Sequence, residues 1–255
     1  NTLVAVPLDG GVQRVLAVGN DFYATPRLSP DGRRLAWLTW HHPNMPWDGT
    51  ELWQADIDSD GSLANPRLMA GGRHESIFQP EWAPDGMLYF VSDRTGWWNL
   101  YRLNAGEAEP LVPMEAEFGL PQWVFGMSTY AFTSPTEIVC TYTRDGVRAM
   151  ARLDTSTGEL KTLDVPYQGI NFRAGSGRVV YVGSSPTLPV AVIRLDPATG
   201  AHEVLHRSSE ISIDAGYISI AQPVEFPTEN GLTAHGYYYP PRNRDYAPPA
   251  GELPP

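Results

Sequence analysis

Hydrophobic residues occur along the chain in short runs of strand length, divided by turns rich in Gly and Pro. Leu35–Trp40 and Met87–Ser92 are two such runs, and each is followed by a polar loop. Runs of four to eight residues bounded by turn formers predict β-strands. Since no long stretch repeats with helical period, the pattern predicts an all-β protein.

The pattern of runs and turns also repeats at longer range. The stretch 22–38 returns at 78–91, a degenerate copy begins at Pro121–Trp123, and another covers 170–182. The copies are spaced by roughly 40 to 55 residues, which is the length of one blade of a β-propeller.

The second copy shows the content of one unit most clearly. Its four strands are expected at Pro80–Trp82, Met87–Ser92, Asn99–Leu103 and Glu109–Val112, with a tight turn at Pro84–Gly86. Four antiparallel strands per repeat predict a β-propeller of four-stranded blades, a fold that protects its sheet edges by radial repetition. A β-sandwich is the alternative.

Counting the units predicts a partial ring. Residues 3–18 supply the outer two strands of one blade, and four fuller units follow, at about 22–71, 78–113, 121–165 and 170–207. About four and a half blades are therefore present, and we expect them to be part of a larger ring that is truncated upstream. The predicted domains are a partial propeller over 1–216 and a linker segment over 217–255, in which 223–241 reads as a hairpin.

Composition and charge limit the kinds of partner. The chain carries 29 acidic and 18 basic residues, a formal net charge of -11, which opposes binding to nucleic acid or to anionic membranes. No apolar run approaches the ~20 residues of a membrane span. The single cysteine, Cys140, lies in an apolar run, where a buried, unreactive thiol is expected.

Three segments together resemble one family of enzymes. Ser29–Ala36, Ser92–Tyr101 and, most specifically, the hairpin Val224–Pro241 are similar to the propeller and linker of prolyl oligopeptidase-family serine peptidases, in their acylaminoacyl-peptidase and dipeptidyl-aminopeptidase-like branch. The resemblance implies that an α/β-hydrolase domain follows the hairpin, with a His-Gly-Gly motif and a Gly-x-Ser-x-Gly elbow. Neither motif occurs here, so no catalytic residue is assigned and this chain alone is expected to be inactive.

The resemblance also implies a role for the propeller. It would cover the active site, limit access to short peptides and hold one end of the substrate, with the hydrolase domain of the same protein as its partner. No cofactor or metal is expected, the location is expected to be cytoplasmic, and homo-oligomerisation is left open. The alternatives are a stand-alone propeller that binds proteins, and a propeller glycosidase, which needs converging carboxylates near the axis.

The two rims of the propeller differ in sequence. One rim, the turn rim, carries the loops between first and second and between third and fourth strands, which are generic turns such as Ser-Pro-Asp-Gly. The other, the connection rim, carries the loops between second and third strands and the connections between blades. These segments contain exposed Trp and Arg, the residue types enriched at binding surfaces. The connection rim is therefore predicted to face the hydrolase domain and the substrate.

Eight residues of the connection rim are the candidate substrate-binding residues. The Glu residues could bind the free amino group of a peptide, or be solvated loop carboxylates; the Arg residues could bind a carboxylate, or pair with Asp93 or Asp145. The adjacent Trp residues could contact substrate, or pack between blades. The set is Trp47, Glu75, Arg94, Trp97, Trp98, Glu115, Glu117 and Arg144.

The loop His41–Thr50 is the longest between second and third strands. Its paired histidines suggest a metal site, but adjacent side chains in an extended segment point apart, and no nearby cysteine or carboxylate pair completes a ligand set. We interpret the loop as a proline-stiffened aromatic lip that contacts the hydrolase domain or the substrate.

Overall fold

The structure, a computed structural model, describes residues 1–249 and 251 of the chain. Four antiparallel sheets of four strands each make up most of it. The first sheet contains β3 (Phe22–Leu28), β4 (Arg34–Trp40), β5 (Glu51–Ile57) and β6 (Leu63–Gly71), and the second contains β7 (Ile77–Trp82), β8 (Leu88–Ser92), β9 (Asn99–Asn104) and β10 (Glu107–Pro110). The third contains β11 (Tyr130–Ser134), β12 (Glu137–Arg144), β13 (Val147–Asp154) and β14 (Leu160–Thr162), and the fourth contains β15 (Gln168–Gly175), β16 (Arg178–Ser185), β17 (Leu188–Leu195) and β18 (His202–Arg207).

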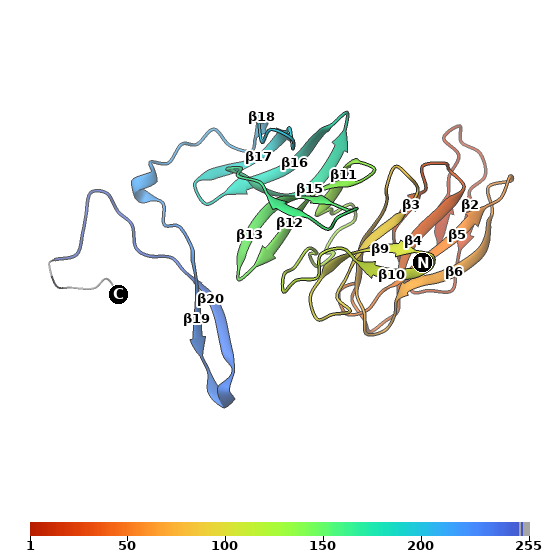
Figure 1. The fold of residues 1–255 in the computed structure, drawn as a ribbon, viewed down its shortest axis with the longest axis horizontal. Coiled ribbons are helices and arrows are strands. Elements are labelled where there is room, and N and C mark those ends of the chain that lie inside the picture. The colour runs from red at the N-terminus through yellow and green to blue at the C-terminus, as the bar shows by residue number, and fades with distance from the viewer. Residues whose placement is uncertain (250, 252–255) are drawn as a thin grey trace.

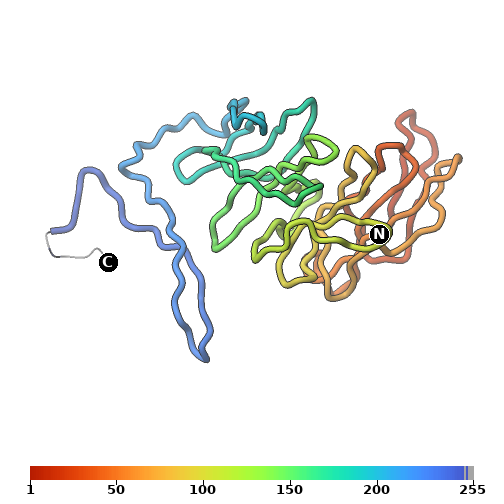
Figure 2. Tube along the Cα trace, in the orientation of Figure 1, coloured from red at the N-terminus to blue at the C-terminus, as the bar shows by residue number. Residues whose placement is uncertain are grey.

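Within each sheet the strands are adjacent in chain order, and the sheets follow one another across the molecule (Figure 1; Figure 2). A two-stranded pair, β1 (Leu3–Ala5) and β2 (Arg14–Ala17), precedes the first sheet. The prediction of an all-β propeller with about four and a half blades is confirmed.

A second two-stranded pair forms the predicted hairpin. It consists of β19 (Gln222–Pro227) and β20 (Thr233–Tyr238), joined through a short 3₁₀ turn at Glu229–Gly231 in which Asn230 has a φ of 61°. The last residues of the predicted linker segment, 250 and 252–255, lie outside the described residues. In the described part of the chain, no helix is long and apolar enough to cross a membrane.

The predicted start of the third blade is wrong. Pro121–Trp123 resembles Pro80–Trp82 in sequence, yet it belongs to the irregular connection between β10 and β11, and the first strand of the third sheet begins at Tyr130. Trp123 is 72% exposed and packs against Trp47 with tilted rings, whereas Trp82 is 7% exposed. The resemblance failed because strand pairing depends on what faces each residue, and Trp123 faces the connection rim.

The first strands of three sheets share a β-bulge. Their pairing with the second strand shifts register between Ala24 and Arg27, between Phe78 and Glu81, and between Ile170 and Arg173. The residue after the first of each pair has positive φ: Thr25 (52°), Gln79 (47°) and Asn171 (60°). Since a bulge bends a strand and re-aims its side chains, the same distortion sets the direction of the side chains that follow it in all three strands.

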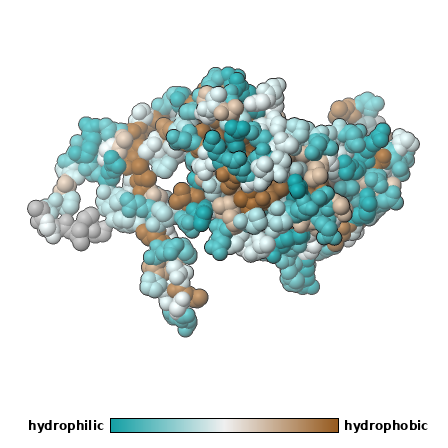
Figure 3. All heavy atoms as spheres, viewed as in Figure 1, coloured by the Kyte–Doolittle hydropathy of each residue, from teal (hydrophilic) through white to brown (hydrophobic). Residues whose placement is uncertain are grey.

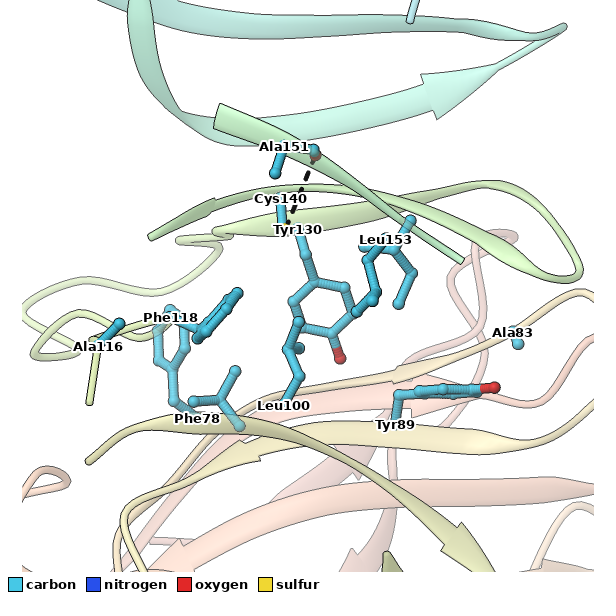
Figure 4. Close-up of a cluster of buried hydrophobic side chains, with 12 residues drawn as sticks. Phe78, Ala83, Tyr89, Leu100, Ala116, Phe118, Tyr130, Cys140, Ala151 and Leu153 are labelled. Atoms are coloured by element: carbon cyan, nitrogen blue, oxygen red, sulfur yellow. Dashed lines mark hydrogen bonds between the residues drawn. The ribbon is translucent and has the colours of Figure 1, made fainter. Parts of the chain in front are cut away.

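Apolar packing between consecutive sheets forms the core. The cluster between the second and third sheets includes Phe78, Leu100, Phe118, Tyr130 and Cys140, each at most 3% exposed. Figure 4 shows Phe78, Tyr89 and Leu100 facing Phe118, Tyr130 and Leu153 across the gap between these sheets. The prediction that Cys140 is buried is confirmed, and complete burial raises the pKa of its thiol to about 12.

One buried polar side chain ties these two sheets together. Gln79, 2% exposed, donates from Nε2 to the carbonyl of Tyr130 (2.8 Å) and accepts from the amide of Thr129 (2.7 Å). In return, the Tyr130 hydroxyl donates to the carbonyl of Gln79 (2.8 Å). These bonds fix the register of the third sheet on the second, because in another register the same buried polar groups would lose their hydration without gaining hydrogen bonds.

The hairpin projects away from the sheets, and hydrophobic atoms lie on its surface (Figure 1; Figure 3). All six residues of β19 are exposed, and Phe226 is 52% exposed. The hydroxyl of Tyr237 donates to the carbonyl of Gly146, in the turn between β12 and β13, at 2.5 Å. This bond links the hairpin to the connection rim of the third sheet.

Replacing Gln79 with Ala should lower stability by about 2 kcal/mol, because it leaves the Thr129 amide and the Tyr130 carbonyl buried without partners. For a chain of this size the midpoint of thermal unfolding should fall by about 4–8 °C, measured by circular dichroism. The control is Gln13→Ala, since Gln13 is exposed and its loss should change stability by less than about 0.5 kcal/mol. Equal midpoints for the two variants would contradict this role of Gln79.

Candidate functional site

The loop His41–Thr50 is fixed to the connection between the first and second sheets. The Thr50 amide donates to the carbonyl of Glu75 (2.9 Å), and the Ser76 hydroxyl donates to the carbonyl of Pro46 (2.9 Å). Gly49 lies so close to Arg73 that a Cβ there would overlap the Arg73 carbonyl. The loop is therefore a rigid lip on the connection rim, and Trp47 is held in one place.

Beside this lip is a cleft of about 480 Å³, which we call the rim cleft. Two tryptophans, Trp47 and Trp98, and two acidic residues, Asp93 and Glu117, line it. Trp47 also packs on Trp123, with ring centroids 4.4 Å apart. The remaining lining residues are Gly96, Gly119, Leu120, Pro121 and Thr143. Segments from the first three sheets thus meet at one mixed aromatic and acidic site.

Trp98 and Glu117 hold each other in position. The backbone amide of Trp98 donates to Glu117 Oε2 (3.0 Å), and the backbone of Glu117 exchanges two hydrogen bonds of 2.9 Å with Thr143. Trp98 stacks on Phe78, with centroids 6.1 Å apart and planes at 4°. Gly119 packs so tightly against the Trp98 ring that a Cβ would overlap it. Trp98 therefore packs between elements, as one of its alternatives expected, and it also lines the cleft.

Asp93 is the partly buried carboxyl group of the rim cleft. Its Oδ1 accepts a hydrogen bond from the amide of Ser76 at 2.7 Å. Burial raises the pKa of Asp93, and the negative charge of Glu75 raises it further, while the Ser76 hydrogen bond opposes the shift. The ionised form of Asp93 is therefore disfavoured unless a cation lies beside it.

Glu75 and Arg94 pair with each other. Glu75 Oε1 lies 2.8 Å from Arg94 Nη2 and 2.9 Å from Nε, and it also accepts from the Ser92 hydroxyl at 2.6 Å. The Arg94 guanidinium lies 5.2 Å from the centroid of the Tyr101 ring. The alternative that Arg94 pairs with Asp93 is wrong. Arg94 pairs with Glu75 instead, and Asp93 accepts a hydrogen bond from the Ser76 amide. In this arrangement Glu75 and Arg94 are engaged with each other.

The other three candidates lie outside the rim cleft. Arg144 pairs with Asp145 at 3.6 Å, as one of its alternatives expected, and its side chain is 59% exposed. Trp97 is 40% exposed, and Glu115 is also exposed. The cleft thus brings together three of the eight predicted residues, Trp47, Trp98 and Glu117.

Sequence reasoning missed several residues of the cleft. Asp93 was considered only as an ion-pair partner, and the connection containing Pro121 was assigned to a strand. Gly119 gave no signal, because its role is to let the Trp98 ring approach the backbone. In the described residues, no group of three or more His, Cys, Asp or Glu side chains could hold a metal ion.

Comparison with known proteins identifies the architecture. The whole chain aligns with puromycin hydrolase at 38% identity and a TM-score of 0.88, and with a puromycin-hydrolyzing peptidase of Mycobacterium tuberculosis at 37% and 0.89. The chain matches the propeller portion of prolyl oligopeptidase-family peptidases. It spans 40% of the length of these two proteins. No family model and no curated protein matches the sequence.

More distant structures share the fold of this propeller portion. Prolyl oligopeptidase B from Galerina marginata aligns with 88% of this chain at 14% identity and a TM-score of 0.67. The aligned region is 31% of that protein's length. At this identity the likeness concerns the fold alone. The sequence-based resemblance to the prolyl oligopeptidase family is confirmed by the closer pair of structures.

The raised pKa of Asp93 predicts a pH effect on stability. A carboxyl group whose folded pKa is raised stabilises the protein below its ordinary pKa of 3.8, and this contribution is lost as the pH rises through the folded pKa. Relative to Asp93→Asn, which keeps an acceptor for Ser76, the unchanged chain should lose stability as the pH rises above 3.8. Thermal unfolding of both proteins across this range measures the difference. A difference that does not vary with pH would contradict the shift.

Proposed function

We propose that this chain is the substrate-gating and peptide-positioning propeller of a prolyl oligopeptidase-family serine peptidase, in which the full-length protein hydrolyses short peptides. The similarity at 37–38% identity over the whole chain to two puromycin-hydrolyzing enzymes supports the assignment to a hydrolase. The catalytic groups would belong to an α/β-hydrolase domain of the same protein, facing the connection rim.

The composition of the rim cleft is the observation that carries the proposal. Two indole rings and two carboxyl groups line a space of about 480 Å³, large enough for the first residues of a peptide. Indole faces and carboxylates both attract cations, and a peptide amino terminus is a cation attached to a variable side chain. The cleft therefore favours a free amino end with an apolar side chain.

The sequence left open which end of the peptide is bound, and the side-chain partners favour the amino end. The two arginines proposed to hold a carboxylate, Arg94 and Arg144, are each paired with an acidic residue. By contrast, Asp93 and Glu117 line the cleft with hydrogen bonds from backbone amides and with no arginine within salt-bridge distance in the described structure. A cation entering the cleft would find two carboxylates to neutralise. This arrangement supports an aminopeptidase-like mode of binding.

In the full-length peptidase, Trp47→Ala should raise KM for short peptides with a free amino terminus about 3- to 30-fold, with little change in kcat. The reason is that one ring of the cleft is removed, which weakens cation and side-chain contacts in the ground state and the transition state alike. Steady-state kinetics with peptides of two to six residues measures the effect.

The matched control is Tyr246→Ala, which removes an aromatic ring that is 79% exposed and outside the cleft. A second substrate series with acetylated amino termini tests which end of the peptide is bound. These peptides lack the cationic amino group, so they should bind the cleft more weakly. Unchanged KM in Trp47→Ala for every peptide length would show that the cleft does not position substrate.

A further inference from the structure

A second cavity, of about 550 Å³, lies along the first strands of the four sheets, and we call it the first-strand cavity. The first strands are neighbours, β3 beside β7 and β11 beside β15. All four strands contribute to its lining, among them with Arg27 from β3, Glu81 from β7, Phe132 from β11 and Arg173 from β15. The cavity shares no lining residue with the rim cleft.

The two arginines of this cavity have different partners. Arg27 Nε lies 3.1 Å from Glu81 Oε2, so its charge is compensated by a neighbouring carboxylate. Arg173 has only neutral partners: its Nη1 donates to the Ser128 hydroxyl and to the Phe172 carbonyl, both at 2.7 Å, and its Nη2 donates to the Gly126 carbonyl at 3.0 Å. In the part of the chain that the structure describes, no carboxylate lies within 4.0 Å of Arg173.

The bonds of Arg173 fix its orientation and leave part of it open. The three bonds engage Nη1 and Nη2, and Nε–H has no protein acceptor among the described residues. Nε and Nη2 form the side of the guanidinium that binds both oxygens of a carboxylate. Because Arg173 is already ordered by neutral oxygens, it loses little conformational entropy when a ligand binds, and its charge is not compensated by these partners.

The surroundings of Arg173 define what the anion would be attached to. Phe132 is partly exposed, and Pro30, Pro84 and Ala174 are exposed at the edge of the same cavity. These groups offer apolar contact and no hydrogen bonds from their side chains. A small hydrated inorganic anion would gain nothing from them, whereas a carboxylate on an apolar body would use both kinds of contact.

We propose that the first-strand cavity is a carboxylate-binding site, with Arg173 as the anchoring cation and Phe132 as the apolar wall. The carboxylate could belong to the carboxyl terminus of a peptide or to an acidic side chain, which share the same chemistry. The site does not depend on the function proposed for the rim cleft.

Binding of four blocked ligands to the chain tests this site. N-acetylphenylalanine carries the carboxylate on an aromatic body, and its amide is the same body without the charge. Two further ligands distinguish the sources: the dipeptide acid N-acetyl-Phe-Phe, and N-acetyl-Glu-Phe-amide, whose carboxylate is on a side chain. Titration followed by ¹H–¹⁵N NMR should show shifts at Phe172 and Arg173 with the acids, and at least about tenfold weaker binding of the amide.

Two variants and a control assign the effect to Arg173. Arg173→Gln should weaken binding of the acid about tenfold or more, and Arg173→Lys, which keeps the charge without the fork, should fall between it and the unchanged chain. Arg207→Gln removes an exposed charge outside the cavity and should bind as the unchanged chain does. Circular dichroism confirms that each variant is folded.

The comparison of acid with amide uses only the unchanged chain, so it stands even where Arg173→Gln fails to fold. Equal affinity for acid and amide, absence of binding for all four ligands, or equal losses in Arg173→Gln and Arg207→Gln would each overturn the proposal. Binding of both the dipeptide acid and the glutamyl amide supports recognition of any carboxylate, and binding of one alone supports the site and identifies its source.

Discussion

The packing of one sheet face against the next is the interaction on which the rest of this structure depends. A four-stranded blade cannot bury its hydrophobic faces by itself, so each blade is stable only against its neighbours. Between the second and third sheets this contact combines an apolar cluster around Phe78 and Tyr130 with the hydrogen bonds of Gln79. Because the polar bonds allow only one register, the loops at both ends of the sheets are placed with equal precision.

Both candidate sites follow from that precision. The rim cleft is assembled from loops of three sheets, and its residues Trp47, Asp93 and Trp98 each have contacts that reach a neighbouring element. The first-strand cavity depends on the bulges that precede Arg27, Glu81 and Arg173. A propeller thus supplies rigid positions, while short irregular features of its strands and loops supply the chemistry.

The sequence predicted the fold well, because strand length, turn chemistry and repeat spacing are local properties. It could not predict partners that depend on tertiary contact. Glu75 and Arg94 were separate candidates, and the structure pairs them at 2.8 Å. Pro121–Trp123 copied the pattern of a first strand but lies in a connection. Arg173 was not among the candidates, because its significance lies in having no carboxylate nearby among the described residues, which no local pattern reveals.

The central claim is that the rim cleft binds the amino end of a peptide, and the indole Nε1–H signals of the eight tryptophans test it most directly. The chain, labelled with ¹⁵N, is titrated with a short peptide that has a free amino terminus and an amidated carboxyl terminus. The account predicts shifts of Trp47 and Trp98 that acetylation of the peptide amino group abolishes, with Trp82 unaffected. Shifts confined to other tryptophans, or shifts of Trp47 and Trp98 that persist after acetylation, would contradict it.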